Sequence, residues 1–189
     1  MLSERIHAVT QRPAAMYHAW GSQNAWLRQI HGENPLYVPA SVMEEAGLKD
    51  GDWAWVISHH GRIRVPVRKM NAVNPLTVWT WNAIGKRKGA WNLDPAAPEA
   101  ERGFLLNHLI DDRLPTEGSG YAYANADPVT GQAAWFDVRV RVYPAEPDEP
   151  RQTWPQFKPQ KKLPGQDPKR GKWLAFIAGA FRKKVKIEQ

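Results

Sequence analysis

Short runs of alternating apolar and polar residues recur along the first 145 residues of the chain. Such alternation is typical of strands with one buried face, and the runs are rich in Val, Ile, Tyr and Trp, which favour strands. The pattern predicts strands at residues 15–20, 36–38, 53–58, 62–69, 77–81 and 135–143. Short strands separated by turn residues indicate a mainly β protein, either a barrel or a sandwich.

Three segments have helical periodicity instead. Residues 40–46 end at Gly47, a residue that commonly stops a helix, and they predict a short helix. Residues 99–112 place large apolar side chains on one face and predict a longer helix. Residues 172–187 combine an apolar face with basic residues at the C-terminal end, where cations suit the helix dipole. We therefore expect a basic amphipathic helix near the end of the chain.

Proline separates this last segment from the rest. Residues 144–168 contain seven prolines in 25 positions, and proline favours an extended linker because it cannot donate to a sheet. The expected organisation has four parts: a lead-in over 1–14, a β domain over 15–145, a Pro-rich linker over 146–170 and a basic amphipathic helix over 171–189.

The formal net charge of +7 is distributed unevenly. Residues 151–189 hold 11 Lys and Arg against two Asp and Glu, whereas residues 1–150 hold 15 basic and 17 acidic residues. A nearly neutral body is not a phosphate-tracking surface, so nucleic acid is not expected as a partner. The first ten residues lack the apolar stretch of a secretory signal, and we expect a cytoplasmic location.

The residue types exclude several kinds of chemistry. Without cysteine the chain has no disulfide, thiolate-ligated metal, iron-sulfur cluster or thiol nucleophile. His59 and His60 fall in a predicted turn, where neighbouring side chains are expected to point apart, so no metal site is predicted. The nucleophile elbow G-x-S-x-G is absent as well. We expect no catalytic residue and no catalysis by this chain alone.

Four motifs follow one another in a fixed order. Residues 17–26 read Y-H-A-W-G-S-Q-N-A-W, and residues 47–63 combine the turn G-L-K-D-G-D with two strands and a hairpin. Residues 104–110 read F-L-L-N-H-L-I, and residues 127–142 begin with the turn D-P-V-T-G-Q. Together they resemble the C-terminal domain of molybdopterin oxidoreductases, the dimethyl sulfoxide reductase superfamily, which binds molybdopterin guanine dinucleotide.

This resemblance covers about residues 15–144 and implies a six-stranded double-psi β-barrel. It implies that loops at one end of the barrel hold the dinucleotide, as part of a bis(molybdopterin guanine dinucleotide) molybdenum cofactor. A larger oxidoreductase subunit would carry the remaining domains and share the cofactor. Amide side chains suit the alternating donors and acceptors of pterin and purine edges, and indoles can lie against the rings. The side chains expected to contact the cofactor are Ser22, Gln23, Asn24, Trp26, Arg28, Asn107, Gln132 and Trp135.

Two other functions remain open. A stand-alone double-psi barrel interaction module would dock an acidic partner or a membrane surface through its basic tail, residues 171–189. That tail would otherwise pack on its own domain or on a partner subunit. A self-processing decarboxylase on the same kind of barrel would be cleaved between Gly21 and Ser22.

Overall fold

The computed structural model describes residues 6–17, 21, 24–72, 74–82, 84, 102–111, 126–127, 129–133, 138–149, 153 and 156–157. The chain divides into two compact units, Met1–Lys158 and Pro159–Gln189, and every described residue belongs to the first. The predicted basic helix at 171–189 and most of the Pro-rich linker lie outside the described residues. Among those that are described, no helix is both long and apolar enough to cross a membrane.

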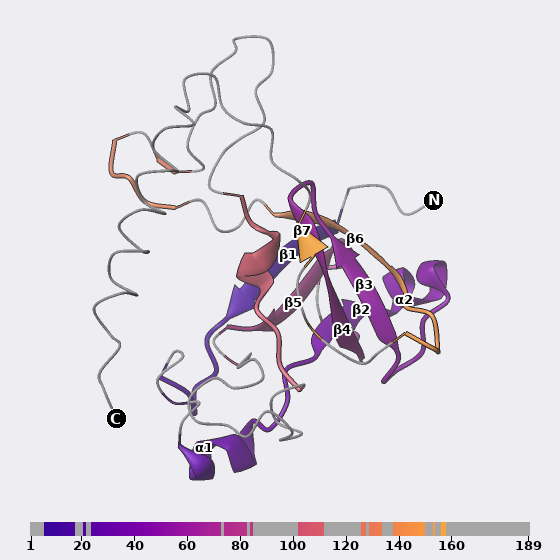
Figure 1. Ribbon diagram of the computed structural model, residues 1–189, viewed down its shortest axis with the longest axis horizontal. Helices are drawn as coiled ribbons and strands as arrows, with labels where there is room; N and C mark the ends of the chain where they lie inside the picture. Colours follow the sequence, from indigo (N-terminus) through magenta and orange to yellow (C-terminus); the bar gives the residue numbers. More distant parts are fainter. Residues whose placement is uncertain are drawn as a thin grey trace, which may run out of the picture. The chain divides into compact units, whose positions relative to one another are not determined.

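Six strands close into a barrel (Figure 1). They are β1 (Ile6–Gln11), β2 (Leu36–Pro39), β3 (Trp53–Ile57), β4 (Gly61–Met70), β5 (Thr77–Trp81) and β6 (Arg139–Pro144). Their order is β2-β5-β1-β6-β3-β4, and a further pairing of β2 with β4 closes the ring. The β1–β5 and β2–β4 ladders are parallel, and the other four ladders are antiparallel. The predicted six-stranded double-psi barrel is confirmed.

The interior of the barrel is aliphatic. In each strand, alternate residues point inward, as Leu36 and Val38 do in β2 on either side of the half-buried Tyr37. The inward side chains are Ile6, Ala8, Leu36, Val38, Ala54, Val56, Ile63, Val65, Val67, Val78, Val140 and Val142. Small and branched side chains fill this space because a barrel of few strands encloses little volume.

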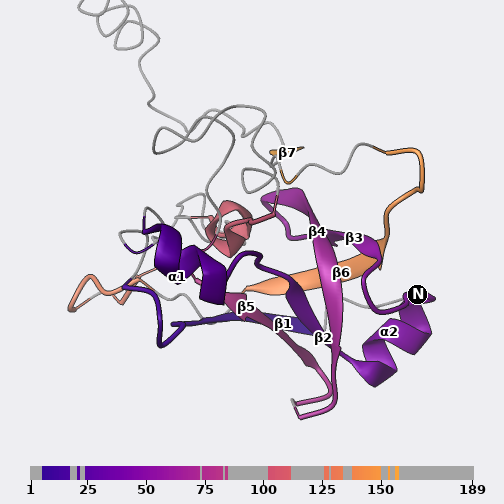
Figure 2. The ribbon, with the colours of Figure 1, turned by 90° about the horizontal axis from the view of Figure 1, so that it is seen from below.

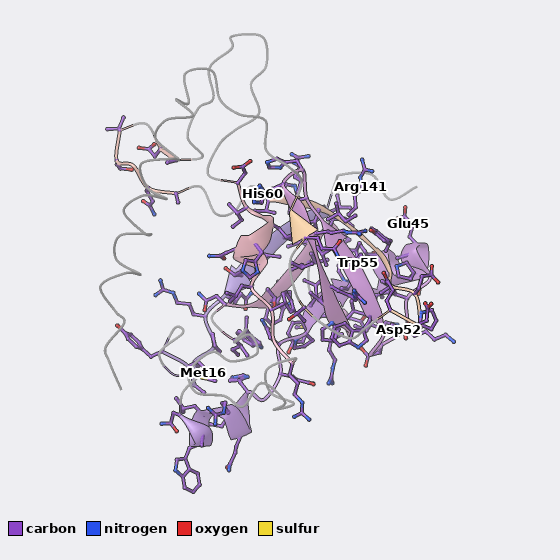
Figure 3. The ribbon with its side chains drawn as sticks, in the orientation of Figure 1. Met16, Glu45, Asp52, Trp55, His60 and Arg141 are labelled. Carbon is purple, nitrogen blue, oxygen red and sulfur yellow. The ribbon has the colours of Figure 1, made fainter. Side chains whose placement is uncertain are left out.

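Trp55 lies on the outer face of β3 yet is buried (Figure 3). The guanidinium carbons of Arg62 and Arg64 lie 4.2 and 4.5 Å from the centre of its ring. The indole Nε1 donates a hydrogen bond of 2.9 Å to Oε2 of Glu149. Because the indole face attracts cations and its edge donates to a carboxylate, this side chain fixes the segment after β6 to the barrel.

Contacts with the barrel continue past residue 145. A short strand, β7 (Gln156–Phe157), pairs antiparallel with the first residues of β4. The hydroxyl of Thr153 donates a hydrogen bond of 2.7 Å to the backbone oxygen of Gly103. The described residues of the expected linker therefore lie on the barrel as far as residue 157.

Two helices lie at opposite ends of the barrel (Figures 1 and 2). α2 (Ala40–Ala46) is the predicted short helix, and it packs Val42 and Met43 into the core. It ends as predicted at Gly47, which has a left-handed φ of 68°. α1 (Ala25–Ile30) was not predicted, and none of its residues is buried.

The prediction of a first strand at 15–20 is wrong for the residues that the structure describes. Residues 15–17 form a turn and irregular backbone, and the first strand is β1, within the expected lead-in. β1 pairs with β5 on one side and β6 on the other, so long-range partners select it. The barrel therefore begins at Ile6 instead of residue 15.

The prediction of a helix over 99–112 is also wrong in its described part. Residues 102–105 are not helical, and one turn of 3-10 helix, η4 (Leu106–Leu109), follows them. The backbone oxygens of Arg102 and Phe104 accept hydrogen bonds from the backbone and side-chain nitrogens of Asn34, at 2.8 and 3.2 Å. These long-range bonds hold the segment in a non-helical conformation despite its helical periodicity.

The turn before β3 is attached to β4. Gly51, with φ of 86°, donates its N–H to the backbone oxygen of Val67 at 3.0 Å, and the backbone oxygen of Asp52 accepts from the Val67 N–H at 2.9 Å. The carboxylate of Asp50 accepts from the backbone N–H of Lys69 at 2.6 Å, and that of Asp52 accepts from the backbone N–H of Lys49 at 2.7 Å. The acidic residues of the G-L-K-D-G-D motif are thus structural, since each carboxylate bonds the backbone.

The variant Gly51→Ala is expected to lower the free energy of unfolding by about 1–2 kcal/mol, the cost of a left-handed conformation for an L-residue. A Cβ at Gly51 would meet no atom within 4 Å, so the loss reports backbone strain alone. Gly51→Asn should lose less, because asparagine tolerates this conformation. Urea unfolding of the full chain measures both variants. Equal losses, or no loss in Gly51→Ala, would contradict the argument.

Candidate functional site

Polar residues gather at the end of the barrel where the parallel strands β1 and β5 finish. The backbone oxygen of Gln11 accepts from the N–H of Asn82 at 2.7 Å, and the rings of His31 and Trp81 lie 5.5 Å apart. Asn34 donates to the backbone oxygen of Trp81 at 2.9 Å. Contacts of this kind join six residues, which we name the β1–β5 rim: Gln11, His31, Asn34, Trp81, Asn82 and Arg102.

Asn34 holds the rim together. The side chain is fully buried, and its Oδ1 accepts from the hydroxyl of Thr80 at 2.8 Å and from the N–H of Trp81 at 3.2 Å. Its Nδ2 donates to the oxygens of Trp81 and Phe104. Both donors and both acceptor positions of the amide are therefore used inside the protein, and Asn34 is a structural residue of the rim.

Asn82 differs from Asn34 in one respect. Its Oδ1 is buried and has no hydrogen-bond partner among the residues that the structure describes, which costs about 1–3 kcal/mol for a buried acceptor. The exposed side chains of Gln11 and Arg102 add an amide and a cation to the rim. Glu33, beside the rim, is paired with Arg68 at 2.8 Å. The rim thus offers neutral donors, neutral acceptors and a cation, which suit a ligand with polar ring edges and an anionic group.

Two of the predicted cofactor ligands, Trp26 and Arg28, lie on α1, and a third, Asn24, caps this helix. Its Oδ1 accepts from the N–H of Trp26 at 2.9 Å. The side chain of Trp26 is 76% exposed, and Arg28 is half-buried in the last turn. His31, the residue after α1, contacts Trp81 and so connects the helix to the β1–β5 rim.

The chain before α1 approaches the helix through Gly21. A Cβ at this position would lie 3.1 Å from Sδ of Met16 and 3.3 Å from Cδ1 of Leu27. Met16 lies on the same side of the barrel as α1 (Figure 3). This close approach favours glycine, because a Cβ here would require Met16 and Leu27 to shift by a few tenths of an ångström.

The other predicted ligands do not belong to α1 or its cap. Asn107 is exposed on η4, which packs against β1 and β4, and Gln132 is exposed in a turn where Ala126 bridges Ala133. The remaining predicted ligands lie outside the described residues: Ser22, Gln23 and Trp135. That all eight meet around one ligand stays a prediction.

The turn that carries Gln132 is organised by Asp127. One carboxylate oxygen accepts from the N–H of Thr130 at 2.7 Å, from its hydroxyl at 2.9 Å and from the N–H of Val129 at 3.0 Å. These bonds lower the pKa of Asp127 below its ordinary value, and the bond from the backbone N–H of Thr130 contributes most to this shift. The D-P-V-T-G-Q motif is therefore a carboxylate-stabilised turn in its own right.

A pH titration tests this turn. Because the pKa of Asp127 is depressed in the folded chain, its stabilisation is present above the unfolded pKa and is lost as the pH falls through the folded pKa. Carboxyl carbon shifts measured by NMR should give Asp127 a midpoint below 3.8, and Thr130→Ala should move it back towards that value. An unchanged midpoint in Thr130→Ala would contradict the assignment.

Two histidines converge on one carboxylate at the β3–β4 hairpin. Nε2 of His59 and Nδ1 of His60 lie 3.9 and 3.5 Å from Oδ2 of Asp111. The expectation that the two side chains point apart is wrong, because the segment after η4 brings Asp111 between them. Within the described residues, no group of three or more His, Cys, Asp or Glu is arranged to hold a metal ion.

Replacing Asn34 tests the integrity of the rim. Asn34→Leu should lower the free energy of unfolding by about 2–4 kcal/mol, because the oxygens of Trp81 and Phe104 both lose their donor in a buried site. Asn24→Ala, which removes an exposed cap, should cost only about 1 kcal/mol. Chemical unfolding of both variants checks the difference. Equal losses in the free energy of unfolding would show that Asn34 does not stabilise contacts between distant segments.

The family of this chain follows from a match to a known domain. A family model described as "Molydopterin dinucleotide binding domain" matches residues 6–126. The chain belongs to this family of molybdopterin dinucleotide-binding domains, and the matched residues include β1 to β5 and the whole β1–β5 rim.

Known proteins resemble the chain in sequence and in structure. One subunit of the sulfite dehydrogenase from Allochromatium vinosum is 60% identical over 180 residues, which cover 95% of this chain and 19% of that protein. The chain thus spans about a fifth of the length of this relative. The structure of acetylene hydratase from Pelobacter acetylenicus aligns with a TM-score of 0.51 at 18% identity, covering 75% of this chain and 18% of that one. This second likeness is one of fold.

Sequence reasoning missed the central residues of the rim. Asn34 stands before a proline and a strand, and Asn82 follows a strand directly, so both have the appearance of ordinary loop residues. The signal available for each was a single amide next to a predicted strand end. Their long-range contacts to Phe104 and Gln11 have no local signature.

Proposed function

We propose that this chain holds one guanine dinucleotide of a bis(molybdopterin guanine dinucleotide) molybdenum cofactor within a larger oxidoreductase. Polypeptide outside these 189 residues would supply the ligand to molybdenum and the rest of the cofactor pocket. The observation that supports this most strongly is that all six residues of the polar β1–β5 rim lie within the segment that matches the dinucleotide-binding family.

The groups at the rim fit such a ligand. The unpartnered Oδ1 of Asn82 accepts a hydrogen bond from a pterin or guanine N–H, and the amide of Gln11 can donate and accept. Arg102 of the rim and Arg28 of the neighbouring helix α1 supply cations for the pyrophosphate. When bound, the molybdenum cofactor supplies the redox chemistry, and the side chains of this chain bind and orient it.

The reaction proposed for the whole enzyme is the oxidation of sulfite. The support is the name and the 60% identity of the relative from Allochromatium vinosum. Substrate choice in such an enzyme depends on groups around the metal, which this chain is not proposed to provide. No contact of the described residues favours the interaction-module alternative, whose basic tail lies outside them.

The cofactor proposal is tested by the composition of the native protein. We expect the full chain, purified from its own host with whatever remains bound, to release two guanine nucleotides per molybdenum atom, measured by mass spectrometry and metal analysis. Release of another nucleotide, or of one guanine nucleotide per metal, would contradict the bis-guanine form. Absence of any pterin nucleotide would overturn the proposed function.

A matched pair of charge reversals tests the site. Arg28→Glu should lower the dinucleotide retained at least about tenfold, because one charge-assisted bond to phosphate contributes more than about 1.4 kcal/mol. Lys49→Glu makes the same charge change in the exposed turn at the α2 end and should leave the cofactor content unchanged. Equal losses in both variants would exclude a local role for Arg28.

A further inference from the structure

Three aromatic rings form one row on the outside of the barrel. Tyr37 of β2 stacks on Trp79 of β5, with ring centres 4.1 Å apart and ring planes 12° from parallel. Trp79 meets Trp81 edge to face at 4.8 Å, and the ring centres of Trp81 and Tyr37 are 6.5 Å apart. We name Tyr37, Trp79 and Trp81 the aromatic row. Because Trp81 is also a residue of the β1–β5 rim, the row begins at the candidate site.

The chemistry of these side chains allows electron transfer. In a chain without cysteine, tryptophan and tyrosine are the side chains that lose one electron most readily. Aromatic rings in van der Waals contact exchange electrons rapidly because their π orbitals overlap, and the overlap is largest for a stacked pair such as Tyr37 and Trp79. An electron can therefore pass along the row in steps from one ring to the next.

Burial along the row sets the place where the transfer ends. Trp79 in the middle is only 6% exposed, whereas Tyr37 and Trp81 at the two ends are half-buried and reach water. An oxidised indole or phenol readily releases its N–H or O–H proton, and contact with water lets the end residues do so. At neutral pH an indole radical takes an electron from tyrosine. The radical is therefore expected to come to rest on Tyr37.

Trp55, the buried indole of β3, lies in a different environment. The guanidinium carbons of Arg62 and Arg64 lie 4.2 and 4.5 Å from the centre of its ring. Positive charge at this distance opposes the loss of an electron, because it repels the radical cation that forms. The ring contacts of Trp79 are instead with the uncharged side chains of Tyr37 and Trp81. Trp79 should therefore be oxidised more easily than Trp55.

We propose that the aromatic row is an electron relay that removes one-electron oxidising equivalents from the β1–β5 rim. A one-electron oxidant, such as a carbonate radical, accepts an electron from Trp81. An electron from Tyr37 then restores the indole, and the phenol releases its O–H proton to water. The net products are the reduced oxidant, a tyrosyl radical and one proton. The relay is a property of this chain, whereas its use in protecting a molybdenum cofactor rests on the proposed function.

A photochemical oxidant attached at the rim tests the relay. Because the chain lacks cysteine, Gln11→Cys gives the full chain a single attachment point for a ruthenium polypyridyl complex. Gln11 is exposed and pairs with Trp81 in the β1–β5 ladder, so the complex is attached beside the row. A light flash in the presence of an external electron acceptor oxidises the ruthenium. We expect a tyrosyl radical to follow, detected by transient absorption and identified by electron paramagnetic resonance.

Two tyrosine variants locate this radical. Tyr37→Phe should lose most of the tyrosyl signal and show an indole radical in its place, because the ring stays while the last electron donor is removed. Tyr143→Phe is the matched control, since Tyr143 is also half-buried and pairs with Trp55 on another part of the barrel. Its signal should be unchanged. A tyrosyl radical that persists in Tyr37→Phe, or equal losses in the two variants, would overturn the relay.

The indoles are tested by replacing Trp79 and Trp81 together with Phe. This double variant keeps a ring at each position but removes the readily oxidised ones, so the tyrosyl radical should form much more slowly. An unchanged rate in the folded variant, verified by urea unfolding, would mean direct transfer to Tyr37 and would also overturn the relay. If the double variant does not fold, Tyr37→Phe decides the outcome.

The relay and the proposed function can fail separately. The flash experiment needs no bound cofactor, so a negative result leaves the proposed function intact. Conversely, native protein that releases no pterin nucleotide but forms the radical on Tyr37 would overturn the proposed function and leave the relay.

Discussion

Closure of the sheet by the parallel ladder between β2 and β4 is the constraint on which the rest of the structure depends. Without the pairing of Leu36–Pro39 with the last residues of β4, both strands would present open edges. These strands are not consecutive: α2 and the Asp50 to Asp52 turn lead from β2 to β3, and the β3–β4 hairpin then leads to β4. The turn bonds Val67 and Lys69, which are members of the same ladder. The G-L-K-D-G-D motif, which the sequence pattern predicts only as a turn between a helix and a strand, is therefore part of the closure of the barrel.

Closure also decides where the tryptophans lie. The ring interior takes aliphatic side chains, and the indoles of β3 and β5 alternate with them on the outside. There Trp79 stacks on Tyr37 with ring centres 4.1 Å apart, and Trp81 meets Trp79 edge to face at 4.8 Å. His31 continues this row at 5.5 Å from Trp81. Packing on the outside of the barrel thus extends to the β1–β5 rim and sets the position of the residue that follows α1.

Much of the fold could be predicted from local patterns in the sequence. The strands near 36–38, 53–58, 62–69 and 77–81 and the helix at 40–46 were predicted because each carries its own alternation, cap or turn. β1 and the segment before η4 could not be predicted in this way. Ile6 and Ala8 become a strand through β5 and β6, and Phe104 is kept out of a helix by an amide 70 residues away. In both places long-range hydrogen bonds override local preference.

The sequence predicted the type of residue at the candidate site, but it missed several of the positions. Asn24 and Arg28 were expected near the ligand, and the structure connects their helix to the rim through His31, a residue that no motif singled out. The family resemblance pointed to loops, whereas the two asparagines of the β1–β5 rim, Asn34 and Asn82, border strands. An isolated amide has no sequence signal that distinguishes a structural partner from a ligand, so its role emerges only when its hydrogen bonds are counted.

The proposed function has a consequence for the geometry of one barrel end. Ligand pockets normally bury most of their ligand, yet the rim residues Gln11 and Arg102 are exposed in this chain. Under the proposed function, the rim is therefore one side of a pocket, and a second polypeptide surface would enclose the ligand. Affinity for the cofactor would then depend on that second surface, because a pocket completed by two surfaces binds tightly only when both are present.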